Sequence, residues 1–342
     1  MLAYYAHSHG NGHLNYARLV AKAVNYPVLI ITALQTPASG KYTVVRIADE
    51  DTMPGEYENA LHNLPEYAHY LPKSNPKIVS RTKQIIDAVY NNAVNLAFID
   101  VSVETAIIFR IASIPYAYCR MLGNRNDMPH TIAYKAAEFL FAYYPKQLEP
   151  ESTPSWLLKH TTYLGFFSKF EYTEKHRVVE ANPDIKGKRV LVICGNGGTL
   201  LTGEVINTII SKLEQCDVVV AGNVEGSYKD FEKNYLGYLE SVEDEISKAD
   251  VVISSCGLNL TSEILALKNK FIAFAEERPY QEQHLICEAL ARHNLAVKLD
   301  IDNVADNVKT LLALQPPDNL HDWFCIPGII KKLEKQISHY EE

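Results

Sequence analysis

Closely spaced cysteines are absent from this sequence. The chain has six cysteines in 342 residues, with no CxxC pair and with mostly apolar neighbours. Zinc ribbons and disulfide scaffolds both need cysteines at short, regular spacings, so neither kind of protein is expected. We interpret the cysteines as reduced thiols of a cytoplasmic protein.

Long apolar runs and clusters of positive charge are lacking as well. No apolar stretch approaches the roughly 18 residues that a membrane-spanning helix needs, and the N-terminal residues lack the pattern of a signal peptide. Lysine and arginine are scattered singly and the net charge is −8, so no nucleic-acid partner is expected. Peripheral contact with the inner face of a membrane stays open.

What the sequence does contain is typical of a folded protein with two domains. Apolar residues make up 47% of the chain and charged residues 22%, which excludes a disordered or fibrous protein. A length of 342 residues suggests two domains, each large enough to bury a core of its own.

Short apolar segments alternate with longer segments of helical periodicity along most of the chain. This alternation is typical of βαβ units and predicts an α/β protein. The strands expected in the first half are Leu2–Ala6, Val28–Thr32, Thr43–Ile47, Leu96–Ile99 and Tyr116–Cys119, with helices at His13–Val24, Lys77–Asn91 and Val103–Ile111. The strands expected in the second half are Lys188–Cys194, Asp217–Ala221, Val251–Ser254, Phe271–Ala275 and Ala296–Leu299. The sequence therefore predicts two Rossmann-like, open parallel sheets that face each other across a cleft.

A stretch with proline, serine and threonine at residues 149–154 separates the two halves. We expect a first domain at residues 1–160 and a second at 161–320. Residues 321–342 include a helical pattern from Ile329 to His339, which we expect to pack across the two domains. Ligands of open parallel sheets bind beyond the carboxyl ends of the strands, so the loops at those ends carry the functional prediction.

The loop from His7 to His13 joins the first strand directly to a helix. Its glycines allow a close approach to a ligand, and the helix N-terminus favours negative charge. His13 would point into the cleft as a neutral base, kept neutral in part by the helix N-terminus. The loop is also compatible with a simple turn or with a metal pair at His7 and His9, but a GxGxxG fingerprint fails because Asn15 occupies its third glycine position.

Three more polar residues follow neighbouring strands of the first half. Asp100 ends one strand and could hydrogen-bond the second nitrogen of His13, or else cap the next helix. Arg120 and Arg125 follow the next strand and could hold an acidic or phosphorylated acceptor, with simple surface arginines as the alternative.

In the second half, a glycine-rich segment joins a buried strand to a helix, as in phosphate-binding turns. Gly197, Gly198 and Thr199 are therefore candidates to contact a nucleotide. A nicotinamide cofactor would need an acidic residue at the end of the following strand, which instead ends in Val220-Ala221-Gly222. The GxxxxGK[ST] pattern of a P-loop ATPase is absent from the sequence.

The next strand runs through small residues into another helix. Ser255 and the amides near Gly257 can hold a diphosphate against the helix dipole, and Glu263 can accept hydrogen bonds from ribose hydroxyls. Glu282 and Gln283 follow a later strand and could bind the hydroxyls of a sugar.

Together these segments resemble the GT-B superfamily of nucleotide-sugar glycosyltransferases over essentially the whole chain. The resemblance is carried by the GNGHxxxxR loop at residues 10–18, by Ser255-Cys256-Gly257 and the helix up to Glu263, and by Glu282-Gln283 before a helix. The sequence looks most like the branch that includes the enzyme adding N-acetylglucosamine to the lipid-linked peptidoglycan precursor and the UDP-glucuronosyltransferase-like enzymes.

The resemblance implies metal-independent transfer of a sugar, with inversion, from a nucleoside-diphosphate donor to an acceptor hydroxyl. The donor is expected to be a UDP-sugar, His13 the general base and Asp100 its partner, with no further cofactor. The acceptor, which is a glycan, a lipid-linked molecule or a small molecule, would bind the first domain. The implied donor contacts are Gly12, Gly197, Gly198, Thr199, Ser255, Gly257, Asn259, Glu263, Glu282 and Gln283, and the implied acceptor contacts are His9, Asn11, Arg120 and Arg125.

Other interpretations stay open beside the transferase. A nucleotide-sugar hydrolase or an epimerase could share the fold, and a non-catalytic protein could bind the nucleotide without turnover. A metal-dependent transferase would use a DxD motif. The segments Asp49-Glu50-Asp51 and Asp300-Ile301-Asp302 match that short pattern, each in a polar turn.

Overall fold

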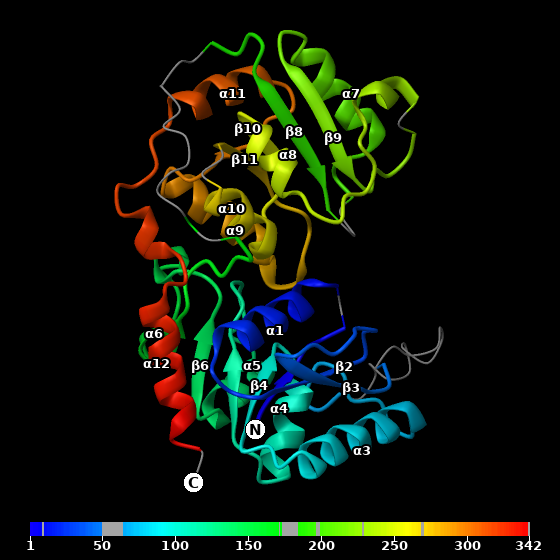
Figure 1. The fold of residues 1–342 in the computed structure, drawn as a ribbon, viewed down its shortest axis with the longest axis vertical. Helices are drawn as coiled ribbons and strands as arrows, with labels where there is room; N and C mark the ends of the chain where they lie inside the picture. The colour runs from blue at the N-terminus through cyan, green and yellow to red at the C-terminus, as the bar shows by residue number, and fades with distance from the viewer. Residues whose placement is uncertain are drawn as a thin grey trace.

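The computed structural model describes residues 1–8, 10–49, 64–170, 172, 184–195, 199–227, 229–267 and 270–340. Within these residues the chain forms two α/β domains that lie one above the other along the long axis of the molecule (Figure 1). Each domain contains one sheet, and the paired strands of both sheets run parallel, as the sequence predicts. The α/β fold class with two open parallel sheets is therefore confirmed.

The sheet of the first domain has seven strands in the order β3-β2-β1-β4-β5-β6-β7. Its strands are β1 Leu2–Tyr5, β2 Val28–Thr32, β3 Tyr42–Arg46, β4 Leu96–Asp100, β5 Tyr116–Cys119, β6 Phe139–Ala142 and β7 Thr161–Tyr163. The helices between them are α1 Gly12–Ala23, α3 Pro76–Asn91, α4 Val103–Ile111, α5 Met128–Ala136 and α6 Ser155–His160. The strand order reverses at β1, which has β2 on one side and β4 on the other, so the loops after β1 and β4 lie at a topological switch point.

Two strands of this sheet were not predicted from the sequence. β6 pairs with β5, and β7 pairs with β6, with Leu140 opposite Thr161. β7 has only three residues and begins with two threonines, so it gives almost no periodic apolar signal. The first sheet therefore continues past residue 160, where the sequence placed the end of the first domain.

The sheet of the second domain has five strands in the order β12-β11-β10-β8-β9. Its strands are β8 Arg189–Cys194, β9 Asp217–Gly222, β10 Val251–Ser255, β11 Lys270–Phe274 and β12 Val297–Lys298. Its helices are α7 Gly203–Lys212, α8 Glu243–Lys248, α9 Leu258–Ala266, α10 Glu282–Arg292 and α11 Val304–Ala313. Short 3₁₀ turns lie at Lys146–Leu148, between β6 and α6, and at Lys229–Asn234, Pro279–Gln281 and Leu320–Trp323. In Figure 1, α9 and α10 lie at the lower end of this domain, toward the first one.

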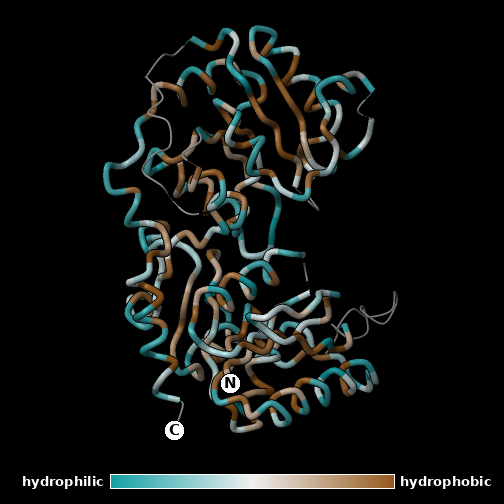
Figure 2. The backbone as a smooth tube through the Cα atoms, in the orientation of Figure 1, coloured by the Kyte–Doolittle hydropathy of each residue, from teal (hydrophilic) through white to brown (hydrophobic). Residues whose placement is uncertain are grey.

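Each sheet is covered on both faces, which explains why its strands are nearly continuous apolar runs. Alternate residues of a strand point to opposite faces, so Tyr4 packs in one apolar cluster while Ala3 and Tyr5 pack in another. Figure 2 shows the hydrophobic residues concentrated in the central strands of the second domain. No helix in the described parts of the chain combines the length and apolar character that crossing a bilayer requires.

The chain crosses between the domains twice. It passes into the second domain after β7 and returns before the last helix, α12 Pro327–Ser338. At the crossing, Gly165 has a φ of +75°, and a Cβ there would lie 2.5 Å from the carbonyl oxygen of Trp323, so glycine is required for the two segments to touch. Trp323 packs in an apolar cluster that includes residues of both domains, such as Tyr144 of the first and Leu290 of the second.

The last helix packs against the first domain, beside α6 and β6 in Figure 1. Its buried residues Leu333 and Ile337 belong to the same apolar cluster as β1 and α1. The sequence predicted this helix close to its observed position and expected it to pack across both domains. The crossing is instead made by the segment before the helix, because the two apolar residues of α12 face the first domain.

Replacement of Leu333 by alanine should destabilise the first domain by about 2–4 kcal/mol, because it removes buried apolar atoms and leaves a cavity. Leu333 is 0% exposed. Urea unfolding followed by circular dichroism measures this change. Lys332→Ala is the control, since the neighbouring Lys332 is exposed on the same helix. Equal stability of both variants would contradict the packing of α12.

Candidate functional site

His13 and Asp100 are brought together by the order of the strands. The register pairs Tyr5 of β1 with Ile99 of β4, so the loops that follow both strands start side by side. Nδ1 of His13, in the first turn of α1, lies 3.1 Å from Oδ2 of Asp100. Asp100 does not cap the next helix, α4. The cap is Ser102, whose side chain accepts a hydrogen bond from the Thr105 amide.

The carboxylate of Asp100 is completely buried and held by its surroundings. The Tyr4 hydroxyl donates a hydrogen bond of 3.0 Å to Oδ2. The next residue, Val101, has a φ of +69°, which is strained for a β-branched side chain and costs about 1–3 kcal/mol. The Tyr118 hydroxyl donates to the Val101 carbonyl and holds this turn. The strained turn fixes the carboxylate in the position that meets His13.

Two carboxylates control the protonation of His13. Burial by itself lowers the pKa of the imidazole, but the negative charges of Asp100 and Glu282 outweigh burial, and the net pKa is raised. The helix N-terminus was expected to help keep His13 neutral, and the two carboxylates act in the opposite direction.

The hydrogen bond to Asp100 also selects the tautomer of His13. Nδ1 donates to the carboxylate, which leaves the lone pair on Nε2 to accept a proton. The side chain of His13 is 18% exposed, so the imidazole is partly accessible to a substrate. The ring of His7 lies 5.8 Å from the ring of His13, centroid to centroid.

The loop that carries His13 touches the second domain. A Cβ at Gly12 would lie 2.9 Å from Nδ2 of Asn259, in the first turn of α9. A side chain at this position would require the Asn259 amide group to shift, so the loop and the start of α9 lie close together. Gly12 and Asn259 were both candidate donor contacts, and the structure places them against each other.

The N-terminus of α9 has no cap from the side chain of the residue before it. Gly257 precedes the helix without a side-chain hydrogen bond to it, and the first turn holds no acidic residue. The backbone amides and the helix dipole there favour a negatively charged group. Ser255 is partly exposed at the end of β10. Glu263 lies farther along α9, with Oε1 3.3 Å from Nζ of Lys169, and burial raises the pKa of its carboxyl.

The glycine-rich segment after β8 is engaged by a residue that the sequence analysis missed. The Thr199 amide and hydroxyl donate to Oε2 of Glu276 at 3.1 and 3.2 Å, and the Leu200 amide donates to Oε1. Contact between Thr199 and a phosphate would therefore require Glu276 to move. The signal for Glu276 was its place just after the predicted strand Phe271–Ala275, where a polar residue reaches the same edge as the other candidates.

Gln283 is tied to this same segment. Its Oε1 accepts the Glu276 amide at 2.9 Å, and its Nε2 would lie 3.8 Å from a Cβ at Gly257. Gln283 therefore lies between the glycine-rich segment and the start of α9. Three candidates, His9, Gly197 and Gly198, lie outside the described residues.

The two arginines expected to bind an acceptor are both buried in ion pairs. Arg120 Nη1 lies 2.8 Å from Glu149 within the first domain, and Arg125 Nη2 lies 2.9 Å from Glu282 of the second domain. Both arginines are less than 9% exposed, so neither is a surface arginine. Each guanidinium already has a carboxylate partner within the protein. Asn11, by contrast, is exposed beside the start of α1.

The second DxD-like segment forms a turn before α11. Asp300 accepts the Asp302 amide at 3.0 Å and the Asn303 side chain at 2.8 Å. These bonds give the aspartates a structural role at the start of that helix. In the first such segment Asp49 accepts the Ser8 hydroxyl, while residues 50 and 51 lie outside the described residues.

Replacement of Asp100 by asparagine should lower the pKa of His13. Burial lowers this pKa, and of the two carboxylates that raise it only Glu282 would remain. Titration of the histidine ring protons by NMR measures the change. Tyr4→Phe is the control, since it removes one hydrogen bond to the carboxylate but keeps the negative charge. An unchanged pKa in Asp100→Asn would show that Asp100 does not control His13.

Comparison with solved structures identifies the fold. No family model and no curated protein sequence matches the chain. A spinosyn rhamnosyltransferase in complex with thymidine diphosphate aligns with a TM-score of 0.59 at 13% identity, over 99% of this chain and 96% of its own. MurG of Acinetobacter baumannii aligns with a TM-score of 0.59 at 14% identity, over 98% and 94%. UGT2 of Phytolacca americana, in complex with UDP-2-fluoro-glucose and pterostilbene, aligns with a TM-score of 0.61 at 13% identity, over 98% and 94%. The chain therefore has the two-domain GT-B fold of these glycosyltransferases.

Proposed function

We propose that this protein is a glycosyltransferase that moves a sugar from a nucleoside diphosphate to an acceptor hydroxyl, with inversion and with His13 as the general base. The observation that carries the proposal is the His13–Asp100 pair, set against the N-terminus of α9 by the contact of Gly12 with Asn259. The similar structures named above, which contain thymidine diphosphate and a UDP-sugar analogue, support this class of donor.

The proposed reaction is a single displacement at the anomeric carbon. The acceptor hydroxyl gives its proton to Nε2 of His13 as its oxygen forms a bond to that carbon. The bond between the carbon and the β-phosphate oxygen breaks, and the nucleoside diphosphate leaves with the electron pair. Asp100 stabilises the imidazolium that forms, since its carboxylate already accepts the Nδ1 proton.

The charge that develops on the leaving group would be stabilised at the start of α9. The backbone amides of the first turn and the positive end of the helix dipole lie there, so this step needs no metal ion in our proposal. On the donor side, the Glu263 carboxylate would leave its ion pair with Lys169 and accept hydrogen bonds from the ribose hydroxyls. Glu282 and Gln283 would contact the sugar. We expect the donor to be a UDP-sugar.

The acceptor would bind the first domain, next to His13. The acceptor could be a glycan, a lipid-linked molecule or a small molecule, and the assay below distinguishes these classes. All six cysteines lie in the described parts of the chain and are free thiols, which supports the cytoplasm as the proposed location.

The first test is a panel of UDP- and TDP-sugars, assayed in EDTA with and without acceptors of these three classes. A transferase releases the nucleoside diphosphate in proportion to glycosylated acceptor. Release of free sugar without an acceptor would identify a hydrolase instead. Binding of the nucleotide with no turnover of any donor would identify a non-catalytic protein.

Replacement of His13 by alanine should lower turnover by about 10²- to 10⁴-fold, because the acceptor then loses its general base. Binding of UDP, measured by calorimetry, should stay near the wild-type value. His339→Ala is the control, since His339 is exposed at the end of α12. Full activity of His13→Ala would refute the assignment of the base.

The same assignment predicts the pH dependence of the wild-type enzyme. A base acts when it is unprotonated, and the pKa of His13 is raised above the ordinary histidine value of 6.5. The value of kcat/KM should therefore rise with pH through a pKa above that value.

Replacement of Glu263 by alanine should weaken UDP binding by about 10- to 100-fold, because a carboxylate that accepts hydrogen bonds from the ribose would be lost. Calorimetry with UDP measures the dissociation constant. Glu240→Ala is the control, since Glu240 is exposed. An unchanged dissociation constant in Glu263→Ala would remove the ribose role from this residue.

A further inference from the structure

The loop after β5 in the first domain meets the turn before α10 in the second. The Asn124 amide donates to the Tyr280 carbonyl at 2.7 Å, and the Asn124 side chain donates to Oε1 of Gln281 at 2.7 Å. Gly123 has a φ of +130°, and a Cβ there would lie 3.0 Å from the Tyr280 carbonyl oxygen. The two segments are therefore built to touch.

The turn that receives these contacts is strained. Tyr280 and Gln281 have φ values of +62° and +57°, so two consecutive residues other than glycine adopt the left-handed conformation. Each costs about 1–3 kcal/mol and persists only where the surroundings hold it. The turn has its own backbone hydrogen bond, from the Gln281 amide to the Arg278 carbonyl, and it is also contacted by Asn124 of the first domain. Glu282, which directly follows the turn, begins α10.

Arg125 is the residue that connects this turn to the first domain most extensively. Its Nη2 donates to Oε2 of Glu282 at 2.9 Å, its Nη1 to Nε2 of His130 at 3.3 Å, and its Cζ lies 4.5 Å from the centre of the Tyr280 ring. The guanidinium thus contacts two residues of the second domain while His130 holds it from the first. The ion pair with Glu282 is largely buried, with 9% exposure of Arg125 and 18% of Glu282.

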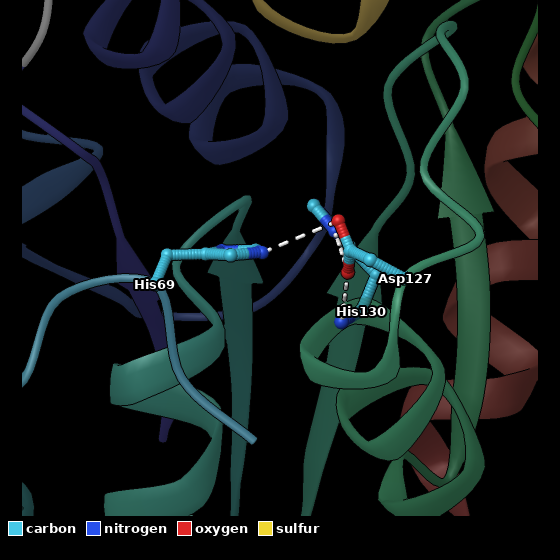
Figure 3. A group of neighbouring side chains, drawn as sticks. All are labelled: His69, Asp127 and His130. Carbon is cyan, nitrogen blue, oxygen red and sulfur yellow. Dashed lines mark hydrogen bonds and ion pairs between the residues drawn. The ribbon is translucent and has the colours of Figure 1, made fainter. Parts of the chain in front are cut away.

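His130 belongs to a cluster with Asp127 and His69, shown in Figure 3. Nδ1 of His130 lies 2.7 Å from Oδ1 of Asp127, and Nε2 of His69 lies 3.3 Å from Oδ2 of the same carboxylate. The Tyr280 hydroxyl lies 3.2 Å from Nε2 of His69 and closes a ring of contacts back to the second domain. Asp127 also accepts the His130 amide at the start of α5.

The protonation pattern of this cluster opposes a metal site. Within the described residues, the ligand atoms of His69, Asp127 and His130 are close enough to hold an ion. The guanidinium of Arg125 can only donate, so Nε2 of His130 must accept and Nδ1 must carry the proton toward Asp127. A metal would need the lone pair of that Nδ1. Burial and the charge of Arg125 lower the pKa of His130 to about 4, which keeps this histidine neutral and able to accept.

We propose that Arg125 is a positioning residue that reaches from the first domain to orient Glu282 in the second, so that the sugar side of the donor site is complete only when the domains are closed. This proposal rests on the proposed function, in which Glu282 contacts the donor sugar. His130 and Asp127 support Arg125, and the strained turn at Tyr280 and Gln281 is held by the same closure.

The chemistry of Glu282 explains why such a residue is needed. Burial raises the pKa of the Glu282 carboxyl, while Arg125 and His13 oppose this rise. A carboxylate that binds sugar hydroxyls must stay ionised and hold one orientation, and the charged hydrogen bond from Nη2 of Arg125 favours both. In the proposed function, the nucleotide binds at the start of α9 and the sugar binds at Glu282. Arg125 should therefore affect the affinity for the sugar and leave the affinity for the nucleotide unchanged.

The test compares dissociation constants of the full chain for UDP and for UDP-glucose or UDP-N-acetylglucosamine, whichever binds the wild type more tightly. In Arg125→Gln, the ratio of the UDP-sugar constant to the UDP constant should rise at least about 10-fold. In the Glu282→Gln background, adding Arg125→Gln should change this ratio little, because Arg125 acts through Glu282. Equal ratios in the wild type and Arg125→Gln, or additive effects in the double variant, would overturn the proposal.

Arg120→Gln is the matched control, because it removes a buried, ion-paired arginine of the same loop whose partner, Glu149, lies in the first domain. We expect it to lower the melting temperature but to leave the ratio unchanged. Small-angle scattering of the ligand-free variants should show a larger radius of gyration for Arg125→Gln than for Arg120→Gln, and equal radii would contradict the role in closure. If the wild type binds neither UDP nor any UDP-sugar, the proposed function itself fails. If the wild type binds a UDP-sugar and Arg125→Gln binds it equally well, only the role of Arg125 fails.

Discussion

The close approach of the two domains at Gly12 and Asn259 is the constraint on which the candidate site depends. A Cβ at residue 12 would lie 2.9 Å from Nδ2 of Asn259, so the loop after β1 directly adjoins the start of α9. His13 is the next residue, and this contact therefore sets its place relative to the helix N-terminus. The sheet supplies the second half of the arrangement, because β1 and β4 are neighbours and bring Asp100 to the same edge.

The charges of the site are consistent with an anionic ligand despite a net charge of −8. The carboxylates around it each have a cationic or hydrogen-bonding partner within the protein: Asp100 meets His13, Glu263 meets Lys169 and Glu282 meets Arg125. These pairings limit the repulsion that a phosphate would meet. The first turn of α9 carries no acidic residue, so its backbone polarity and helix dipole favour negative charge there.

The strand-end rule explains which parts of the site could be predicted from the sequence. It placed His13 and Asp100 at one edge, because the strand pattern fixes which loops share an edge of a parallel sheet. It could not find the pairing of Arg125 with Glu282, which are 157 residues apart and meet through docking of two separate domains. No local pattern encodes such a contact. The strand β7 was missed for a local reason, because three residues are too few to show a period of alternating apolar residues.

The return of α12 to the first domain has a consequence for the order of folding during synthesis. The chain leaves the first domain after β7, builds the whole second domain, and only then supplies Leu333 and Ile337 to the first core. Until the ribosome has released those residues, the face that receives them stays open to water. The domain that begins the chain therefore receives its last core residues only after the second domain has been synthesised.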